Sequence, residues 1–262
     1  MRHLCAHRSH GGEAAGDRLR LLLYNIRYGT GRRTRWAWLH ALTRTVSHLP
    51  EIGRFIEDVS PDVAGLVEVD SGSYRSGGRN QAEELAANLG HYHSFRVKYH
   101  RHGPGRWLPV LNKQANAFLT RDSFLDERFH YFEDGFKKLV IELEMERVNL
   151  FLVHLSIGFR SRHRQLSDLH DLVCASSKPC IVAGDFNVLS GPREVRLFLS
   201  ATGLRSANAD HAPTYPSWCP RRELDFVCYT PDLALTRFEI PNVTLSDHLP
   251  MICDFRLPGD PA

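Results

Sequence analysis

The stretch Ile181-Val182-Ala183-Gly184-Asp185-Phe186-Asn187 (IVAGDFN) joins an apolar run, typical of a buried strand, to a carboxylate and a carboxamide two residues apart. Side chains two apart on an extended segment face the same side. The pattern therefore predicts that Asp185 and Asn187 point together at one site while Phe186 turns into the core. A lone Asp after a strand is more often a cap or turn residue, so this stretch needs support from the rest of the chain.

The 262 residues, 42% hydrophobic and 24% charged, indicate a globular chain that one large domain can accommodate. No apolar run approaches the roughly 20 residues needed to cross a bilayer. Residues 1–17 are rich in Gly, Ala and polar residues and lack the apolar core of a secretory signal. We expect a disordered tail over 1–17, a single domain over 18–262 and a cytoplasmic location. No obligate protein partner is evident.

Apolar runs that end in turn or polar residues predict strands, and segments with helical spacing lie between them. The strand-like runs are 18–25, 62–69, 114–120, 137–145, 148–155, 179–187, 224–230 and 250–255, and the helical segments are 51–59, 79–90, 162–176 and 192–203. A polar stretch at Glu146 and Arg147 predicts a hairpin. The absence of a regular βαβ rhythm favours a two-sheet α+β sandwich over a parallel sheet.

Polar residues recur at or just beyond the ends of these runs. They are Asn25, Glu68, His154, Asp185 with Asn187, and Asp247 with His248. Together they supply hard oxygen ligands, two imidazoles and two carboxamides, which is the inventory for metal-assisted attack of water on a phosphate. The six cysteines are dispersed without a CxxC pair, which argues against a zinc site.

The blocks LYNIRYG, LVEVD, VHLS, GDFN, LDFV and SDHLP occur in an order that resembles the endonuclease/exonuclease/phosphatase superfamily, which includes deoxyribonuclease I and the exonuclease-III-type apurinic endonucleases. The resemblance spans residues 19–255. It implies a four-layer αββα sandwich of two mainly antiparallel sheets flanked by helices. It also implies an active site at one edge of the sheets and hydrolysis of phosphoesters with a divalent metal.

The resemblance implies that Glu68 is the principal ligand of Mg²⁺ (or Mn²⁺), with Asn25 beside it and Asp247 near the metal. One carboxylate and a carboxamide can suffice when substrate phosphate and water complete the shell.

The resemblance also implies five catalytic residues. Asp185 would orient or deprotonate the attacking water, and Asn187 would hold a phosphoryl oxygen. His248 and His154 would contact the phosphate, with Asp225 as the acidic partner of His248. An acidic partner raises the pKa of an imidazole and favours a cation beside developing negative charge. The alternative for Asp225 is a loop-anchoring ion pair with a neighbouring arginine.

Four further residues are weaker candidates for substrate binding: Arg27, Asn116, Arg160 and Arg164. Arg27 stands where apurinic endonucleases carry an acidic residue, which argues against a second metal ligand there. Asn116 either reaches the site or bonds a neighbouring strand. Arg160 and Arg164 either bind phosphate or form a solvated face.

The family acts on DNA, RNA ends, phosphoinositides, sphingomyelin and nucleotide-like molecules, so the resemblance does not identify the substrate. The net charge of +3 is mild for an enzyme dedicated to duplex DNA. The segment GTGRRTRWAWLHAL (29–42) mixes arginine with tryptophan, which suits nucleotides, a lipid headgroup layer, or an amphipathic helix with tryptophans packed inward.

No other exposed apolar anchor is evident in the sequence, which favours a nuclease-type substrate over a phospholipid or phosphoinositide and leaves peripheral membrane contact open. Residues 70–81, rich in Ser and Gly, form either a flexible loop over the site or a plain surface loop. A catalytically inactive binding module on the same scaffold is the remaining alternative. The joint presence of the site residues argues against it.

Overall fold

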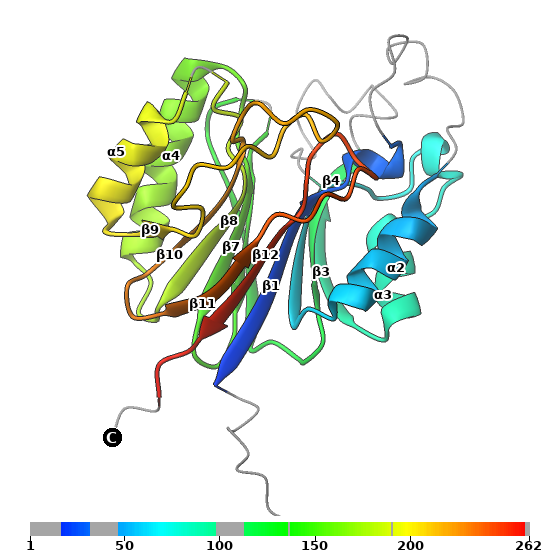
Figure 1. Ribbon diagram of the computed structural model, residues 1–262, viewed down its shortest axis with the longest axis horizontal. Helices are drawn as coiled ribbons and strands as arrows, with labels where there is room; N and C mark the ends of the chain where they lie inside the picture. Colours follow the sequence, from blue (N-terminus) through cyan, green and yellow to red (C-terminus); the bar gives the residue numbers. More distant parts are fainter. Residues whose placement is uncertain (1–16, 32–46, 98–112, 136, 190, 260–262) are drawn as a thin grey trace, which may run out of the picture.

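Apolar side chains on both faces of the long strands determine the layering of this protein. The computed structural model describes residues 17–31, 47–97, 113–135, 137–189 and 191–259. Within them, two six-stranded sheets lie face to face with a pair of helices on each outer side (Figure 1). This is the αββα sandwich that the sequence predicts.

The first sheet has the strand order β11-β12-β1-β2-β4-β3. Its members are β1 (Arg18–Asn25), β2 (Val63–Asp70), β3 (Tyr92–Val97), β4 (Gln114–Thr120), β11 (Ala234–Glu239) and β12 (Met251–Arg256). The second sheet has the order β5-β6-β7-β8-β10-β9. Its members are β5 (Asp126–Tyr131), β6 (Leu139–Glu144), β7 (Asn149–His154), β8 (Cys180–Asp185), β9 (Arg205–Ser206) and β10 (Asp225–Tyr229). The pairs β1–β2 and β7–β8 are parallel and the other pairs are antiparallel.

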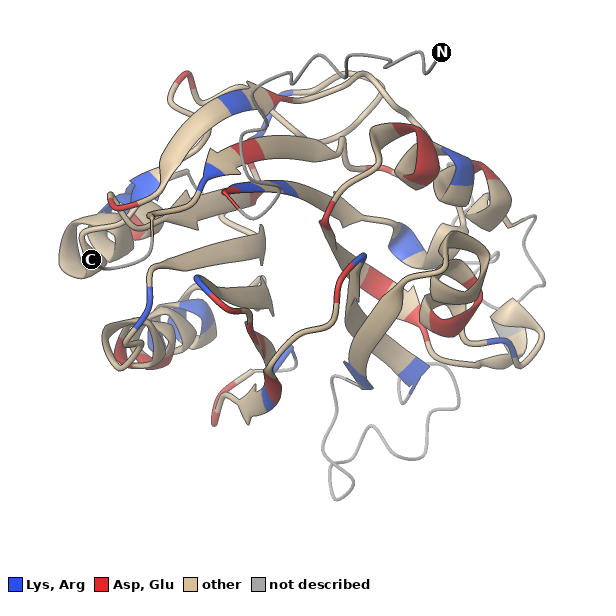
Figure 2. Ribbon diagram, turned by 90° about the horizontal axis from the view of Figure 1, so that it is seen from below, with Lys and Arg blue, Asp and Glu red and all other residues tan. Residues whose placement is uncertain are grey.

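Two α-helices cover each sheet. On the first sheet they are α2 (Leu49–Val59) and α3 (Gln81–Leu89), and on the second α4 (Phe159–Cys174) and α5 (Arg193–Thr202). Two 3₁₀ turns, η1 (Arg27–Gly29) and η2 (Tyr74–Ser76), follow β1 and β2. No helix in the described part of the chain is long and apolar enough to cross a bilayer. Figure 2, which views the molecule from below the orientation of Figure 1, shows acidic and basic residues interspersed rather than segregated.

The core consists of three apolar layers, one between the sheets and one under each helix pair. In β1, Leu21 and Leu23 face the other sheet while Leu22 faces the helices. In β8, Ile181 faces the first sheet and Val182 faces the helices. Burial on both faces explains why these strands read as continuous apolar runs and not as alternating patterns.

Gly184 shows how closely β7 and β8 approach each other. Its φ is +156°, and a Cβ at this position would lie 2.0 Å from the carbonyl oxygen of Val153 on β7. No side chain fits there, so the glycine of the GDFN block is required by packing.

The predicted strands and helices are present with shifted ends, and the hairpin between β6 and β7 is confirmed by a turn in which Met145 N donates to Val148 O (3.0 Å). The sequence did not predict β3, β5, β9 and β11. Edge strands β5 and β11 are half-exposed and polar, so they lack the apolar run used for the prediction. The division into a tail over 1–17 and one domain stays a prediction, because residues 1–16 lie outside the described ranges.

Residues 70–81, which the sequence predicts as either a flexible loop over the site or a plain surface loop, begin with a turn after β2. The turn after β2 is hydrogen-bonded, because the carboxylate of Asp70 accepts from the backbone N–H of Gly72 (3.0 Å) and Ser73 (2.6 Å).

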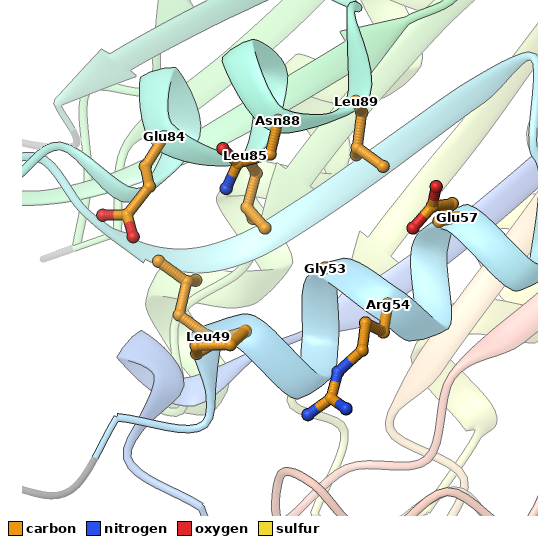
Figure 3. Close-up of a pocket in the computed structure, with 9 residues that line it drawn as sticks. Leu49, Gly53, Arg54, Glu57, Glu84, Leu85, Asn88 and Leu89 are labelled. Carbon is orange, nitrogen blue, oxygen red and sulfur yellow. The ribbon is translucent and has the colours of Figure 1, made fainter.

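A groove of about 360 Å³ lies between α2 and α3 (Figure 3). It is lined by helix side chains such as Leu49, Leu85 and Leu89, and none of the predicted site residues takes part.

Candidate active site

The predicted site residues meet at one edge of the sandwich because of strand direction. Asn25, His154 and Asp185 end β1, β7 and β8, and Asp225 begins the antiparallel strand β10. His154 and Asp225 are the two cross-strand partners of Asp185. Asp247 and His248 lie in the loop that enters β12 at this edge. The site therefore draws on both sheets, at the upper edge in Figure 1.

Glu68 reaches the site through an irregularity in β2. The register between β2 and β4 shifts between Leu66 and Val69, and Glu68 has a left-handed backbone with φ of +59°. Such a β-bulge re-aims one side chain at some backbone cost. As a result Glu68 Oε1 lies 3.8 Å from His154 Nε2, while Val69 faces the helices.

Asp185 is the centre of the cluster. Its Oδ2 accepts from Asn25 Nδ2 (3.1 Å) and lies 3.4 Å from His154 Nε2 and 3.9 Å from His248 Nε2. Its Oδ1 accepts from the backbone N–H of Asn187 (2.9 Å). The residue is buried. One carboxylate thus faces both imidazoles and the first sheet.

His248 is held by a buried acid, as the sequence predicts. Its Nδ1 lies 2.8 Å from Asp225 Oδ2, and the same oxygen accepts from the hydroxyl of Thr214 (2.6 Å). The ring of Tyr215 packs against the imidazole with 4.9 Å between ring centres. These contacts leave Nε2 directed toward Asp185 and confirm the pairing of Asp225 with His248.

Burial and neighbouring charges shift the pKa values of this cluster. Burial lowers the pKa of His248, but Asp225, followed by Asp185 and Asp247, more than offsets this effect and raises it from 6.5 to about 10. Burial raises the pKa of Asp185 from 3.8 to about 6, against the lowering influence of His248. Burial also raises the pKa of Asp247. The two acids therefore lack full compensation for their negative charge.

Asn187 corrects one part of the sequence prediction. β8 ends at Asp185, and Asn187 has a left-handed backbone with φ of +52°, so the expectation of an extended segment through Asn187 is wrong. In the tight turn, the backbone N–H of Asn187 instead donates to Asp185 Oδ1, and Asn187 Nδ2 donates to Leu155 O (2.9 Å). Phe186 is buried as expected, against Phe226.

A buried arginine fixes the loops that follow β7 and β8, directly after His154 and Asp185. Arg162, 1% exposed, is paired with Glu194, with 2.9 Å between Nε and Oε2. Its Nη1 donates to the carbonyl oxygens of Ile157 (2.6 Å) and Asn187 (3.0 Å). The guanidinium satisfies the loop backbone that a helix or sheet would otherwise satisfy.

The four weaker candidates divide into two groups. Arg27 belongs to the site, since its Nε lies 3.3 Å from Asp247 Oδ2 and its backbone N–H donates to Asn25 Oδ1 (3.1 Å). Asn116 is fully buried on β4, opposite the bulge at Glu68, and neither Nδ2 nor Oδ1 has a hydrogen-bond partner among the described residues.

Arg160 and Arg164 are exposed in the first two turns of α4. Arg164 Nη1 pairs with Asp134 Oδ2 at 2.7 Å, which accords with the solvated-face alternative for this residue.

The sequence analysis missed three residues of the site: Lys137, Thr214 and Tyr215. Lys137 Nζ contacts His154 Nε2 and lies 4.0 Å from Glu68 Oε1. No motif marks this lysine, which lies in the turn between β5 and β6. Thr214 and Tyr215 are separated by a long loop from the histidine that they support, so spacing gave no signal.

The donor set fits a hard divalent cation. Asp185, Asp225 and His248 place their ligand atoms within 4.8 Å of one another and form a possible metal site. Asp225 Oδ2 and His248 Nδ1 already bond each other, which leaves carboxylate and carboxamide oxygens on the first-sheet side as the better ligands. Asp225 Oδ1 is buried without a partner among the described residues. Uncompensated buried oxygens are what a bound cation would neutralise.

The fold and the site define a class of protein, the αββα sandwich with its acids and histidines at one sheet edge. The model of the Endonuclease/Exonuclease/phosphatase family matches residues 22–248, so the chain belongs to this family. Most members are metal-dependent phosphoesterases. The resemblance seen in the sequence is thereby confirmed.

Individual relatives are similar over different lengths. A UPF0294 protein of Klebsiella pneumoniae is 32% identical over 114 residues, covering 44% of this chain and 42% of the relative. A UPF0294 protein of Vibrio cholerae is 36% identical over 118 residues, covering 44% of the chain and 41% of the relative. The match thus spans about two fifths of each curated relative.

Solved structures agree over nearly the whole chain. An endonuclease/exonuclease/phosphatase from Beutenbergia cavernae is 22% identical with a TM-score of 0.69, covering 94% of this chain and 73% of that one. The human Nocturnin catalytic domain, solved with a sulfate anion, is 21% identical with a TM-score of 0.63, covering 92% and 95%. Similarity at this level establishes the fold alone.

Proposed function

We propose that this protein hydrolyses phosphoesters, in the first place phosphodiesters, with Mg²⁺ or Mn²⁺ as cofactor. The observation that carries the proposal is the convergence of two imidazoles on one buried carboxylate. His154 Nε2 and His248 Nε2 lie 3.4 and 3.9 Å from Asp185 Oδ2. An acid between two potential phosphate contacts is placed to act on a water that attacks the phosphorus.

Glu68, Asn25 and Asp247 are the residues that would hold the metal. When bound there, a divalent cation neutralises charge on the phosphoryl oxygens and orients the ester. Arg27, which pairs with Asp247 and donates to Asn25 Oδ1, fixes two of these side chains.

The remaining steps belong to the side chains. Asp185 orients the water and accepts its proton while the water oxygen forms a bond to phosphorus. The bond from phosphorus to the leaving oxygen breaks, and that oxygen departs as an anion that solvent water protonates. His248, kept cationic by Asp225, donates Nε2–H to a phosphoryl oxygen and stabilises the charge that develops in the transition state. Asn187 uses one amide hydrogen on Leu155 O, which leaves the second for the phosphate. His154 makes the second imidazole contact.

The test is hydrolysis of bis-p-nitrophenyl phosphate with and without Mg²⁺. Asp185→Asn and His248→Ala should each lose at least about a hundredfold in kcat while remaining folded. Asp122→Asn, in an exposed turn, is the matched control and should behave like the parent.

Full activity in excess EDTA would contradict the metal dependence. Retained turnover in either site variant would contradict the assigned roles. A folded parent that binds Mg²⁺ and phosphate but never turns over would support the binding-module alternative.

The substrate is a separate question. The segment 32–46, which contains the Arg/Trp mixture, lies outside the described residues. The preference for a nuclease-type substrate rested on the lack of another exposed apolar anchor. The structure shows exposed apolar side chains at the edge that carries the site, so this argument against a lipid substrate no longer holds.

A further inference from the structure

Exposed apolar side chains gather at the edge of the molecule that carries the site. The described residues expose eight large apolar or aromatic side chains. Five lie in loops or at the start of a helix at the active-site edge: Tyr74 (44% exposed), Ile157 (58%), Phe159 (60%), Leu189 (37%) and Trp218 (44%). Single exposed apolar residues need no explanation, but a group of five around one site does. These five residues are called the apolar rim.

The remaining three exposed side chains lie elsewhere. Tyr92 begins β3 opposite Thr120, and Leu125 bonds Glu144, so both belong to the opposite edge of the sheets. Leu197 lies within α5, on the outer layer. The distribution is therefore polarised toward the site.

Part of the apolar rim is held together by the Arg162 guanidinium. Its Nη1 bonds the carbonyl oxygens of Ile157 and Asn187, and Leu189 N donates to Asn187 O (2.8 Å). The guanidinium therefore ties together the loops after β7 and β8, from which Ile157 and Leu189 extend. Phe159 follows two residues after Ile157 and stacks on exposed His163, with ring centres 6.2 Å apart.

Trp218 lies beside the other catalytic loop. The backbone N–H of its neighbour Ser217 donates to Asp247 O (2.8 Å), next to His248. Tyr74 lies in η2, past the end of β2 that carries Glu68. The apolar rim thus flanks the site from four segments, each of which follows or contacts a segment of the site.

Basic side chains accompany the rim. Arg160 adjoins Phe159, Arg193 opens α5 after Leu189, and Arg221 and Arg222 follow Trp218, all of them exposed. Acidic residues are the usual choice for the first turn of a helix, yet α4 has none there.

Two acidic residues of this edge, Glu133 and Asp134, occupy the turn between β5 and β6, and Asp134 is paired with Arg164. Among the described residues, neither acid forms an ion pair with the four arginines beside the apolar rim, since Asp134 pairs with Arg164 instead.

We propose that the apolar rim rests on an anionic phospholipid surface and that the substrate is a phosphoester presented in a lipid headgroup. The substrate part rests on the proposed function. Apolar side chains entering the interface, with arginines at headgroup level, are the combination that binds peripheral proteins to anionic membranes.

A nucleic acid explains this rim less well than a lipid surface. Single strands are bound by aromatic faces and cations, whereas Ile157 and Leu189 offer neither. With about 200 Å² per large side chain and the fractions above, Ile157, Phe159 and Leu189 expose on the order of 300 Å² together, which is the lower end of the range for the largest patch of a typical monomer. Aliphatic contact of this size suits acyl chains.

The first experiment measures binding without catalysis. The full chain in EDTA is sedimented with vesicles of phosphatidylcholine alone or mixed with phosphatidylglycerol. The triple variant Ile157→Ser/Phe159→Ser/Leu189→Ser should lose at least about tenfold in vesicle affinity. The control Tyr92→Ser/Leu125→Ser removes comparable exposed side chains from the opposite edge and should bind like the parent.

The second experiment separates the rim from the chemistry. The triple variant should keep the parent's hydrolysis of soluble bis-p-nitrophenyl phosphate and lose hydrolysis of vesicle phospholipid. Arg160→Gln/Arg193→Gln should weaken binding to the anionic vesicles and leave binding to phosphatidylcholine alone unchanged, since it removes only the electrostatic attraction.

Equal vesicle binding by the parent and the triple variant, or none by the parent, would overturn the inference while leaving the proposed hydrolysis intact. Tight binding of single-stranded DNA that the triple variant loses would reassign the rim to nucleic acid. A concentration-dependent dimer that the triple variant abolishes would reassign it to a second copy. If the parent does not hydrolyse the soluble diester, that result would contradict the proposed function instead.

Discussion

Replacing Asp225 by Asn tests how the site keeps His248 charged. The exchange preserves the size of the side chain and removes a buried negative charge 2.8 Å from His248 Nδ1. The Thr214 hydroxyl donates to the same carboxylate oxygen, and it can still donate to the carbonyl oxygen of the Asn. The same carbonyl oxygen then also faces Nδ1, but as a neutral acceptor it stabilises the charged imidazolium less than the carboxylate does.

The size of the effect follows from the lost interaction. A hydrogen bond between charged groups contributes about 1.5–3 kcal/mol, and each 1.36 kcal/mol in a barrier is about tenfold in rate. We expect kcat to fall by roughly 10- to 150-fold if the full interaction acts in the transition state. Because Asp225 raises the pKa of His248 more than any other group does, the pKa should drop well below about 10 in the variant.

Two measurements check this prediction. The first is kcat for bis-p-nitrophenyl phosphate with Mg²⁺ across neutral and alkaline pH, where the deficit should grow as pH rises. The second is an NMR titration of the His248 ring in metal-free protein. Asp254→Asn, which breaks the ion pair with Arg20 on the first sheet, is the control. An unchanged kcat together with an unchanged His248 titration would refute the reasoning.

Three further results are expected. The folded-state pKa of His248 is raised above its usual value, so the stabilising contribution of the charged imidazole is full below about pH 6.5 and is lost as pH rises toward about 10. In urea unfolding, the stability difference between the metal-free parent and His248→Gln should therefore shrink over this range. A difference that stays constant with pH would contradict this expectation. Gly184→Ala should cost about 3 kcal/mol or more in unfolding free energy, because the new methyl group meets Val153 O, whereas Gly158→Ala, with open space around it, is the control; equal melting temperatures would refute this. Glu68→Gln should weaken Mg²⁺ binding about tenfold or more in calorimetric titration of the folded protein, and unchanged binding would exclude Glu68 as a ligand.

The layers of the fold could be predicted because each central strand is apolar on both faces, as in the run Leu21 to Leu23. Edge strands β5 and β11 could not, because half of their surface faces solvent and their sequences, DERFHY and ALTRFE, carry charge. Strand ends were predicted less well than strand centres. The turn at Asn187 is one case, since its left-handed backbone has no signature in GDFN beyond the tolerance of Asn for that conformation.

Most of the candidate site could be predicted from strand-end residues and their order. The residues that were missed depend on long-range closure. Lys137 reaches Glu68 only because the β5–β6 turn folds over the sheet edge, and Thr214 supports Asp225 across a loop. The bulge at Glu68 depends on the register with β4, which local sequence does not encode.

The hydrogen bond from Asn25 on β1 to Asp185 on β8 spans the gap between the two sheets. The geometry of the candidate site therefore depends on the spacing of the two sheets, whereas the backbone pairing within each sheet does not. At Gly65 in the inter-sheet layer, a Cβ would meet Leu152 Cδ1 at 3.1 Å. A methyl group there would require the Leu152 side chain of the facing sheet to shift by a few tenths of an ångström. Under mild denaturant or pressure, the proposed hydrolysis should accordingly decrease while the far-ultraviolet circular dichroism of the strands persists.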